Sequence, residues 1–185
     1  MSRLFSRTLR PGAIALGLSL SLAFSGAAVA GDPVTEARET VAVFQKSDPG
    51  LARFFRDSPG YAVFPSVGKG AVIVGGAGGG GTVFERGQPV GKTSLAQVTV
   101  GLQLGGQAYS EIIFFENAAA LSDFKKGNFA LAAEVSAVAL SAGASANAKY
   151  QRGVAVFTLT KTGLMYEASV GGQKFSYQRL DGKGS

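Results

Sequence analysis

Basic side chains with few acids nearby are the residues of this chain best suited to hold a ligand, because they could contact an anionic group. A lysine near an anionic membrane surface contributes about 1 kcal/mol of binding free energy. The candidates are Arg53, Arg56, Lys69, Lys92, Lys125 and Lys126. A structural role is also open for the lysine pair, since lysines in the last turn of a helix stabilise its dipole. The two arginines, one helical turn apart, equally fit a solvated helix face.

The composition excludes the commonest catalytic sites. The chain has no histidine and no cysteine, so it can build neither a Ser-His-Asp triad nor a cysteine nucleophile, and it lacks the usual zinc ligands. Glu111 and Glu116 are candidate carboxylates, but their spacing on a predicted strand places them on opposite faces. We therefore expect a protein without enzymatic activity, cofactor or metal.

Two glycine-containing segments resemble phosphate-binding loops without meeting their requirements. The run GGAGGGG at 75–81 contains G-x-G-x-x-G, but strand-like residues follow it where a dinucleotide site needs a helix. The segment GQPVGKT at 87–93 lacks the first glycine of a P-loop, since Arg86 stands at that position. We predict a tight turn or bend at the glycine run and no nucleotide binding.

The first 30 residues have the order of charged and apolar residues that is typical of a secretory signal peptide. Arg3, Arg7 and Arg10 precede an apolar run over 12–24, which is shorter than the about 20 residues needed to span a bilayer. Ala28-Val29-Ala30 is a cleavage motif, so we predict cleavage after Ala30 and a periplasmic or secreted protein. Without cysteine, the processed chain cannot be a lipoprotein.

The remaining residues, 31–185, have the size of one domain with its own core. Without the three arginines of the signal, the net charge falls from +6 to +3, and such a value does not by itself point to nucleic acid. We expect one domain, with N-terminal helices over 33–57 and a β-rich body over 61–180.

The helices of this domain are predicted from their start and stop signals. Asp32-Pro33 is a start signal, and apolar residues at 34, 37, 41 and 44 recur at helical spacing. Asp48-Pro49 repeats the signal, and the short helix after it should end before Pro59. One more helix should be inserted later, with Asn117 as its N-cap and Gly127 at its end.

From Tyr61 onward, glycines separate short runs rich in Val, Ile, Phe and Thr, a pattern that predicts strands. The candidates are 61–64, 71–75, 82–86, 95–104, 107–116, 154–160, 164–170 and 174–179, the last three as a meander. Over 95–104, Ala96 should share one face with the other apolar residues, and Gln97 should lie on the opposite face. The fold class predicted is α+β, with a curved antiparallel sheet or partly closed barrel, N-terminal helices and one inserted helix.

The segment 129–148 holds Glu134 as its one charge and many small residues, and we predict a strand there. Two interpretations stay open for it. The segment could be a core strand lined with small residues, or it could be a groove wall that accommodates an acyl chain.

Four blocks of the sequence together resemble the SYLF domain, a lipid-binding family found in bacteria and eukaryotes. They are YAVFPSVGKGAVIVGGAGGGG at 61–81, SEIIFFENAAALSDFKKGNF at 110–129, SAGASANA at 141–148 and GLMYEASVGGQKFSY at 163–177. The resemblance implies binding rather than catalysis. In eukaryotic members it implies phosphoinositide binding with a basic N-terminal helix, whereas the first helix here also carries Glu36 and Glu39.

We therefore expect a non-enzymatic lipid-binding domain of the bacterial cell envelope, with anionic phospholipid or a membrane surface as its partner. The alternative is a structural or protein-interaction module of the envelope, which would bind another protein through its sheet edge.

Overall fold

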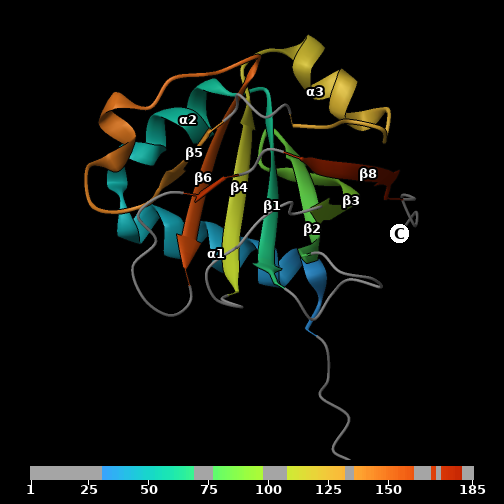
Figure 1. The fold of residues 1–185 in the computed structure, drawn as a ribbon, viewed down its shortest axis with the longest axis horizontal. Coiled ribbons are helices and arrows are strands. Elements are labelled where there is room, and N and C mark those ends of the chain that lie inside the picture. The colour runs from blue at the N-terminus through green and yellow to red at the C-terminus, as the bar shows by residue number, and fades with distance from the viewer. Residues whose placement is uncertain are drawn as a thin grey trace, which may run out of the picture. The chain divides into compact units, whose positions relative to one another are not determined.

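The computed structural model describes residues 31–68, 77–97, 108–131, 136–160, 168–169 and 172–180 (Figure 1). The predicted signal peptide, the candidate residue Lys69 and the candidate strand at 71–75 lie outside these ranges. Cleavage after Ala30 therefore stays a prediction.

Three of the described helices, which begin at Pro33, Pro49 and Ala118, follow a residue whose side chain accepts a hydrogen bond from a free amide group. In α1 (Pro33–Ser47), the Asp32 carboxylate accepts a hydrogen bond from the Thr35 amide and a proline occupies the first turn. The short helices η1 (Pro49–Leu51) and α2 (Ala52–Asp57) follow. Later come α3 (Ala118–Lys125), capped by Asn117, and the single turn η3 (Ala144–Asn147). Within the described ranges, no helix has both the length and the apolar composition needed to cross a membrane.

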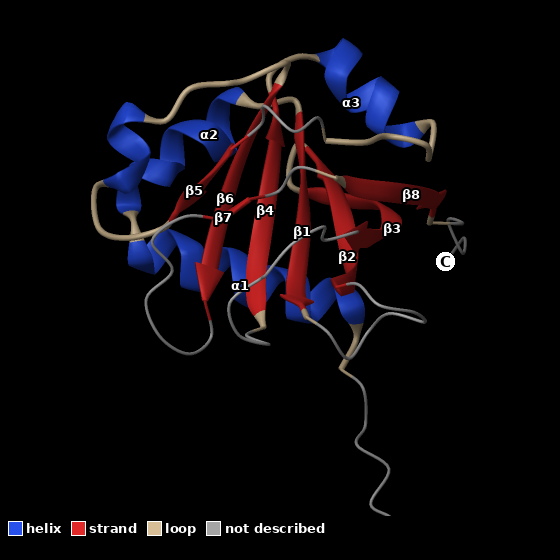
Figure 2. Cartoon of the chain, viewed as in Figure 1, coloured by secondary structure: helices blue, strands red, loops and turns tan. Residues whose placement is uncertain are grey.

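The strands form one sheet in the order β7-β5-β6-β4-β1-β2-β3-β8 (Figure 2). Their bounds are β1 (Gly60–Val67), β2 (Ala77–Glu85), β3 (Gln88–Gln97), β4 (Tyr109–Phe115), β5 (Ser136–Ala139), β6 (Val154–Thr160), β7 (Ala168–Ser169) and β8 (Gln173–Arg179). The α+β class is confirmed. The sheet is mixed rather than antiparallel, because β5 pairs with β6 in parallel. It is not closed into a barrel, since β7 and β8 are its two edges in the described part of the chain. The curvature of the sheet stays a prediction.

Three local predictions also differ from the structure. The last strands do not form a meander, because β7 pairs with β5 and β8 pairs with β3. The glycines at 78–81 lie within β2 rather than in a turn, since each of them pairs with a residue of β3. Of the segment 129–148, Ser136–Ala139 is a strand, whereas Ala144–Asn147 forms η3 after Gly143, whose φ is 77°.

Apolar side chains are buried on both faces of the sheet. One face, here called the α1 face, packs against α1 and α2 and includes Phe44, Phe54, Ile112, Phe114 and Phe157. The other, the α3 face, packs against α3 and includes Phe64, Ile113, Phe115, Phe124 and Phe175. Successive residues of β4 alternate between two apolar layers, which explains why 112–115 is continuously hydrophobic.

Ala96 and Gln97 lie on opposite faces of β3, as predicted, and the face that carries Gln97 is the buried one. Residues 98–104 of the predicted strand lie outside the described residues. Leu95 and Gln97 are buried, whereas Ala96 is exposed. Gln97 can lie inside because its side-chain oxygen accepts a hydrogen bond from the Tyr109 hydroxyl, at 3.0 Å. The face of β3 that carries Ala96 is open to solvent instead.

Candidate functional site

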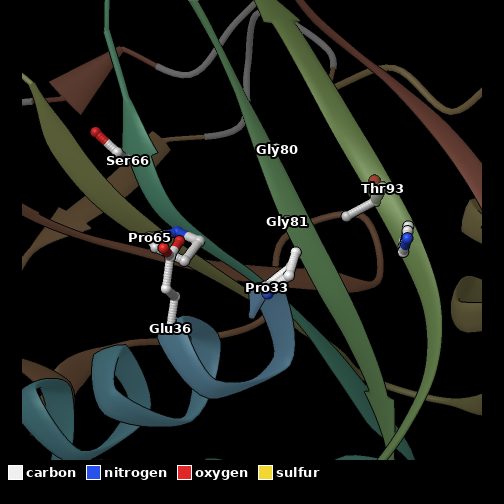
Figure 3. A pocket seen from close by; sticks show the side chains of 8 residues that line it. Pro33, Glu36, Pro65, Ser66, Gly80, Gly81 and Thr93 are labelled. Carbon is white, nitrogen blue, oxygen red and sulfur yellow. The ribbon is translucent and has the colours of Figure 1, made fainter. Parts of the chain in front are cut away.

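A hollow of about 310 Å³ lies between the start of α1 and strands β1, β2 and β3 (Figure 3). Its lining residues are Pro33, Glu36, Pro65, Ser66, Gly80, Gly81, Lys92 and Thr93. A second hollow, of about 570 Å³, shares Glu36, Pro65 and Ser66 with the first and continues along α1 to Val43. Val43 is 52 % exposed, which is unusual for a large apolar side chain in the described part of this fold.

Two glycines of β2 leave this hollow unfilled for different reasons. A Cβ atom at Gly81 would lie 2.5 Å from the carbonyl oxygen of Val63, so only glycine fits where β2 approaches β1. A Cβ atom at Gly80 would meet nothing within 4 Å. Glycine at that position keeps the floor of the hollow flat.

The hollow contains charges of both signs. Lys92 projects from the exposed side of β3, and Glu36 lies on the helix opposite. The pKa of Asp32, at the start of the same helix, is lowered mainly by hydrogen bonds from Thr35, and Lys92 lowers it further. An anion bound at Lys92 would therefore lie near two carboxylates as well as one ammonium group.

Lys92 also belongs to a wider exposed surface, here called the β3–β8 outer face. It consists of Lys92, Ser94, Ala96, Lys174, Ser176 and Gln178, which are all exposed. The strand register places Lys92 beside Gln178, Ser94 beside Ser176 and Ala96 beside Lys174. The hydroxyl oxygens of Ser94 and Ser176 lie 2.6 Å apart. The surface thus carries two ammonium groups, small polar side chains and no acid.

Arg53, which the sequence predicted to contact lipid, forms hydrogen bonds within the chain instead of projecting freely. Its Nη2 atom donates hydrogen bonds to the carbonyl oxygens of Ser145, Ala146 and Ala148, and its guanidinium stacks over Phe54 at 4.7 Å. The buried carboxylate of Asp48 accepts a further hydrogen bond, of 2.7 Å, from the Ser145 amide. Hydrogen bonds therefore connect the segment 141–148, one of the four blocks that resemble the SYLF domain, to the region where α1 ends and α2 begins.

Three other predicted cations form ion pairs within the chain. Arg56 pairs with Asp57 at 2.7 Å, Lys126 with Asp123 at 2.6 Å and Lys125 with Glu85 at 2.5 Å. The structure does not bring the predicted residues together. Arg53 and Arg56 lie on α2, Lys92 lies on β3, and Lys125 and Lys126 end α3, which covers the opposite face of the sheet from α2.

A buried polar cluster, which the sequence analysis missed, lies on the α3 face. Gln173 Nε2 of β8 donates to Glu111 Oε2 of β4 at 3.1 Å and to the Tyr109 hydroxyl at 3.2 Å, and that hydroxyl donates to Gln97 Oε1. Glu111 is fully buried, whereas Glu116 is exposed just beyond β4, so the two carboxylates form no pair. The sequence did contain a sign of this cluster. Gln97, Glu111 and Gln173 each occupy a strand position that lies on the same face as apolar residues of that strand.

The burial of this cluster changes its titration. Burial raises the pKa of Glu111 to about 8, although the hydrogen bond from Gln173 acts in the opposite direction. The pKa of Tyr109 is also raised, mainly by burial. Within the described ranges, no group of three His, Cys, Asp or Glu residues is arranged to hold a metal ion.

Comparison with known proteins gives two matches. Residues 96–180 match the family model Ysc84, described as "Las17-binding protein actin regulator". The chain is also 29% identical over 157 residues to "Beta cell expansion factor A" from Aeromonas veronii. That alignment covers 78% of this chain and 59% of the relative, so the chain spans about three fifths of the relative's length.

Proposed function

Because residues 96–180 carry a Ysc84 (SYLF) domain, as the sequence motifs indicated, we propose that this chain is a non-enzymatic domain that binds phospholipid in the bacterial cell envelope. The domain is the observation that carries the proposal, since this family is not a known enzyme family. The predicted signal peptide supplies the envelope location, and the chain has neither histidine nor cysteine for the commonest catalytic sites.

The contacts of the basic residues suggest where an anionic headgroup would bind. Arg53, Arg56, Lys125 and Lys126 all have partners inside the chain, and a paired cation must give up its partner to attract a lipid. Lys92 forms no ion pair within 4.0 Å among the described residues. It shares the β3–β8 outer face with Lys174. Glu36 and Asp32 lie beside Lys92 at the start of α1, but the outer face itself holds no acid, so this face supports anionic phospholipid as the partner.

Vesicle flotation tests this proposal directly. The protein should float with vesicles that contain phosphatidylglycerol, should float less with phosphatidylcholine alone, and should bind more weakly as salt rises. The double variant Lys92→Glu, Lys174→Glu should bind less than the parent. The matched control is Lys46→Glu, Lys149→Glu, which has the same net charge but changes exposed lysines outside the outer face.

Two results would contradict the proposal. A parent protein that floats with neither vesicle at low salt would exclude lipid binding. Equal binding by the parent, the outer-face variant and the control would exclude the β3–β8 outer face as the contact.

Protein binding is the second candidate function, because the family description refers to Las17 binding and actin regulation. The feature of this chain that favours it is the exposed Val43 at the rim of the larger hollow, since an exposed large apolar side chain can anchor a partner. Under this alternative, substitution of Val43 rather than of the lysines would abolish the interaction.

A further inference from the structure

Glu111 joins two strands that lie far apart in the sheet order. Three strands, β1, β2 and β3, stand between β4 and β8, yet Gln173 of β8 donates a hydrogen bond to Glu111 of β4 across the α3 face. Both side chains are fully buried. Gln173 also donates a hydrogen bond to Tyr109 of β4. The cluster of Gln97, Tyr109, Glu111 and Gln173, here called the Glu111 cluster, therefore links the first residue of β8 to β4, an inner strand of the sheet.

Among the residues that the structure describes, none that faces Glu111 carries a charge that could stabilise its ionised form. Thr158 lies opposite it on β6, and Phe64 pairs with it on β1. The side chains that α3 packs on this face are apolar: Ala120, Leu121 and Phe124. Among the described side chains facing Glu111, Tyr109 alone can titrate, and its pKa is raised as well. The ion pair of Lys125 and Glu85 lies at the other end of β2, where Glu85 pairs with Gly60.

Several polar atoms in and beside this cluster lack a partner. Within the described residues, Glu111 Oε1, Gln173 Oε1 and Thr158 Oγ1 are buried and accept or donate no hydrogen bond. A neutral carboxyl is buried here at moderate cost, because it carries no net charge. A carboxylate does not, since a buried unpaired charge costs several kcal/mol more than a buried neutral group.

The position of the cluster determines what ionisation would disturb. Tyr109 begins β4, Gln97 ends β3 and Gln173 begins β8, so the cluster occupies one end of the sheet. Strand ends open at lower free energy than strand centres. Water can therefore reach the carboxylate by local separation of β8 from β4, without unfolding of the domain.

We infer that Glu111 is a pH-sensitive contact: in its neutral form it holds the start of β8 against β4, and its ionisation releases that end of the strand. The raised pKa of Glu111 places the transition near pH 8. The released segment includes the hydrogen bonds of Phe175 N–H to the Phe129 carbonyl and of Leu131 N–H to the Gln173 carbonyl. The inference does not depend on lipid binding.

Hydrogen exchange followed by NMR on the full chain tests this inference. After correction for the direct effect of pH on exchange chemistry, the amides of Leu131 and Phe175 should exchange about tenfold faster at pH 9 than at pH 7, as the ionised fraction rises. The amide of Ile113, in the centre of the sheet, should change little. Glu111→Gln should abolish the pH effect, whereas Glu116→Gln, at an exposed carboxylate, should retain it.

The inference is overturned if the corrected exchange of Phe175 in the parent is the same at both pH values, or if it follows the same curve in Glu111→Gln. If the Glu111→Gln variant does not fold, measurements on the parent protein alone test the inference. Its Glu111 carboxyl carbon must titrate with the same midpoint as the exchange of Phe175. A midpoint near the ordinary value of 4.5, or a raised midpoint with no change at Phe175, overturns the inference.

Discussion

The Nζ atom of Lys125 at the end of α3 lies 2.5 Å from Oε1 of Glu85 at the end of β2, and both side chains are about one third exposed. Lys125 also lies over the ring of Tyr177, 5.9 Å from its centre. Lys125→Glu would place two carboxylates in contact, so we expect it to lower the free energy of unfolding by about 1 kcal/mol. The exchange variant Glu85→Lys, Lys125→Glu should recover most of this loss. Urea unfolding measures both, and a Lys125→Glu variant as stable as the parent would show that the pair contributes nothing.

The same pair decides how a lipid-binding variant must be interpreted. Lys125→Glu with Lys126→Glu should reduce binding to phosphatidylglycerol vesicles less than Lys92→Glu with Lys174→Glu does, because Lys125 and Lys126 already form ion pairs within the chain. The exchange variant keeps the net charge, so it should bind nearly as well as the parent if only overall charge matters. If the double variant floats with anionic vesicles as well as the parent at low salt, these lysines act only within the chain.

Arg53 should matter for stability rather than for lipid binding. Arg53→Lys keeps the charge but cannot reach three carbonyl oxygens with a planar group. We expect it to lower the free energy of unfolding by about 2 kcal/mol, since hydrogen bonds to charged groups contribute about 1.5–3 kcal/mol. Arg56→Lys, at an exposed pair with Asp57, should leave it nearly unchanged. Equal effects of the two substitutions in urea unfolding would refute the structural role of Arg53.

The sequence was most informative where local signals determine structure. Asp32 and Asn117 mark the helix starts because each side chain can accept a hydrogen bond from an amide three residues later, which is a short-range property. Strand β6 was predicted with its full bounds from a short run rich in Val, Phe and Thr after Gly153. The pairing of strands depends on distant residues, so the parallel contact of β5 with β6 left no such signal.

The candidate site was predicted less well for a related physical reason. A basic residue with few acids beside it in the sequence can still meet an acid in space, as Lys125 meets Glu85 forty residues away. The sequence placed Gln97 on the face of its strand opposite the apolar residues and Glu111 on the face opposite Glu116, and neither was predicted to be buried. In the fold, Gln97 is hydrogen-bonded to Tyr109, and Gln173 is hydrogen-bonded to both Tyr109 and Glu111. The two contacts of Gln173 form only because β8 lies close to β4.

The stability of the domain should fall as pH rises through neutrality. Burial raises the pKa of Glu111 from 4.5 to about 8, so the native state binds this proton more tightly than the unfolded chain does. The stabilisation that comes from this tighter proton binding is complete below about pH 4.5 and is lost progressively as the pH rises to about 8. Each pKa unit corresponds to about 1.4 kcal/mol, so the loss is on the order of a few kcal/mol. Urea unfolding between pH 5 and 9 checks this. Glu111→Gln should flatten the profile, and an unchanged slope in that variant would assign the effect to other groups.

The two neighbouring glycines of β2 should respond differently to the same added methyl group. At Gly81, the Cβ atom of alanine would lie 2.5 Å from the Val63 carbonyl oxygen and 2.7 Å from the Phe64 ring. The backbone cannot move away without breaking the β1–β2 pairing, so Gly81→Ala should lower the free energy of unfolding by about 1–3 kcal/mol. At Gly80 the added atom meets nothing within 4 Å, and alanine restricts the unfolded chain more than glycine does. Gly80→Ala should therefore be neutral or should stabilise the domain by up to about 1 kcal/mol. Thermal unfolding of the two variants separates these outcomes, and a Gly81→Ala variant as stable as Gly80→Ala would mean that β2 does not approach β1 as closely as the structure places it.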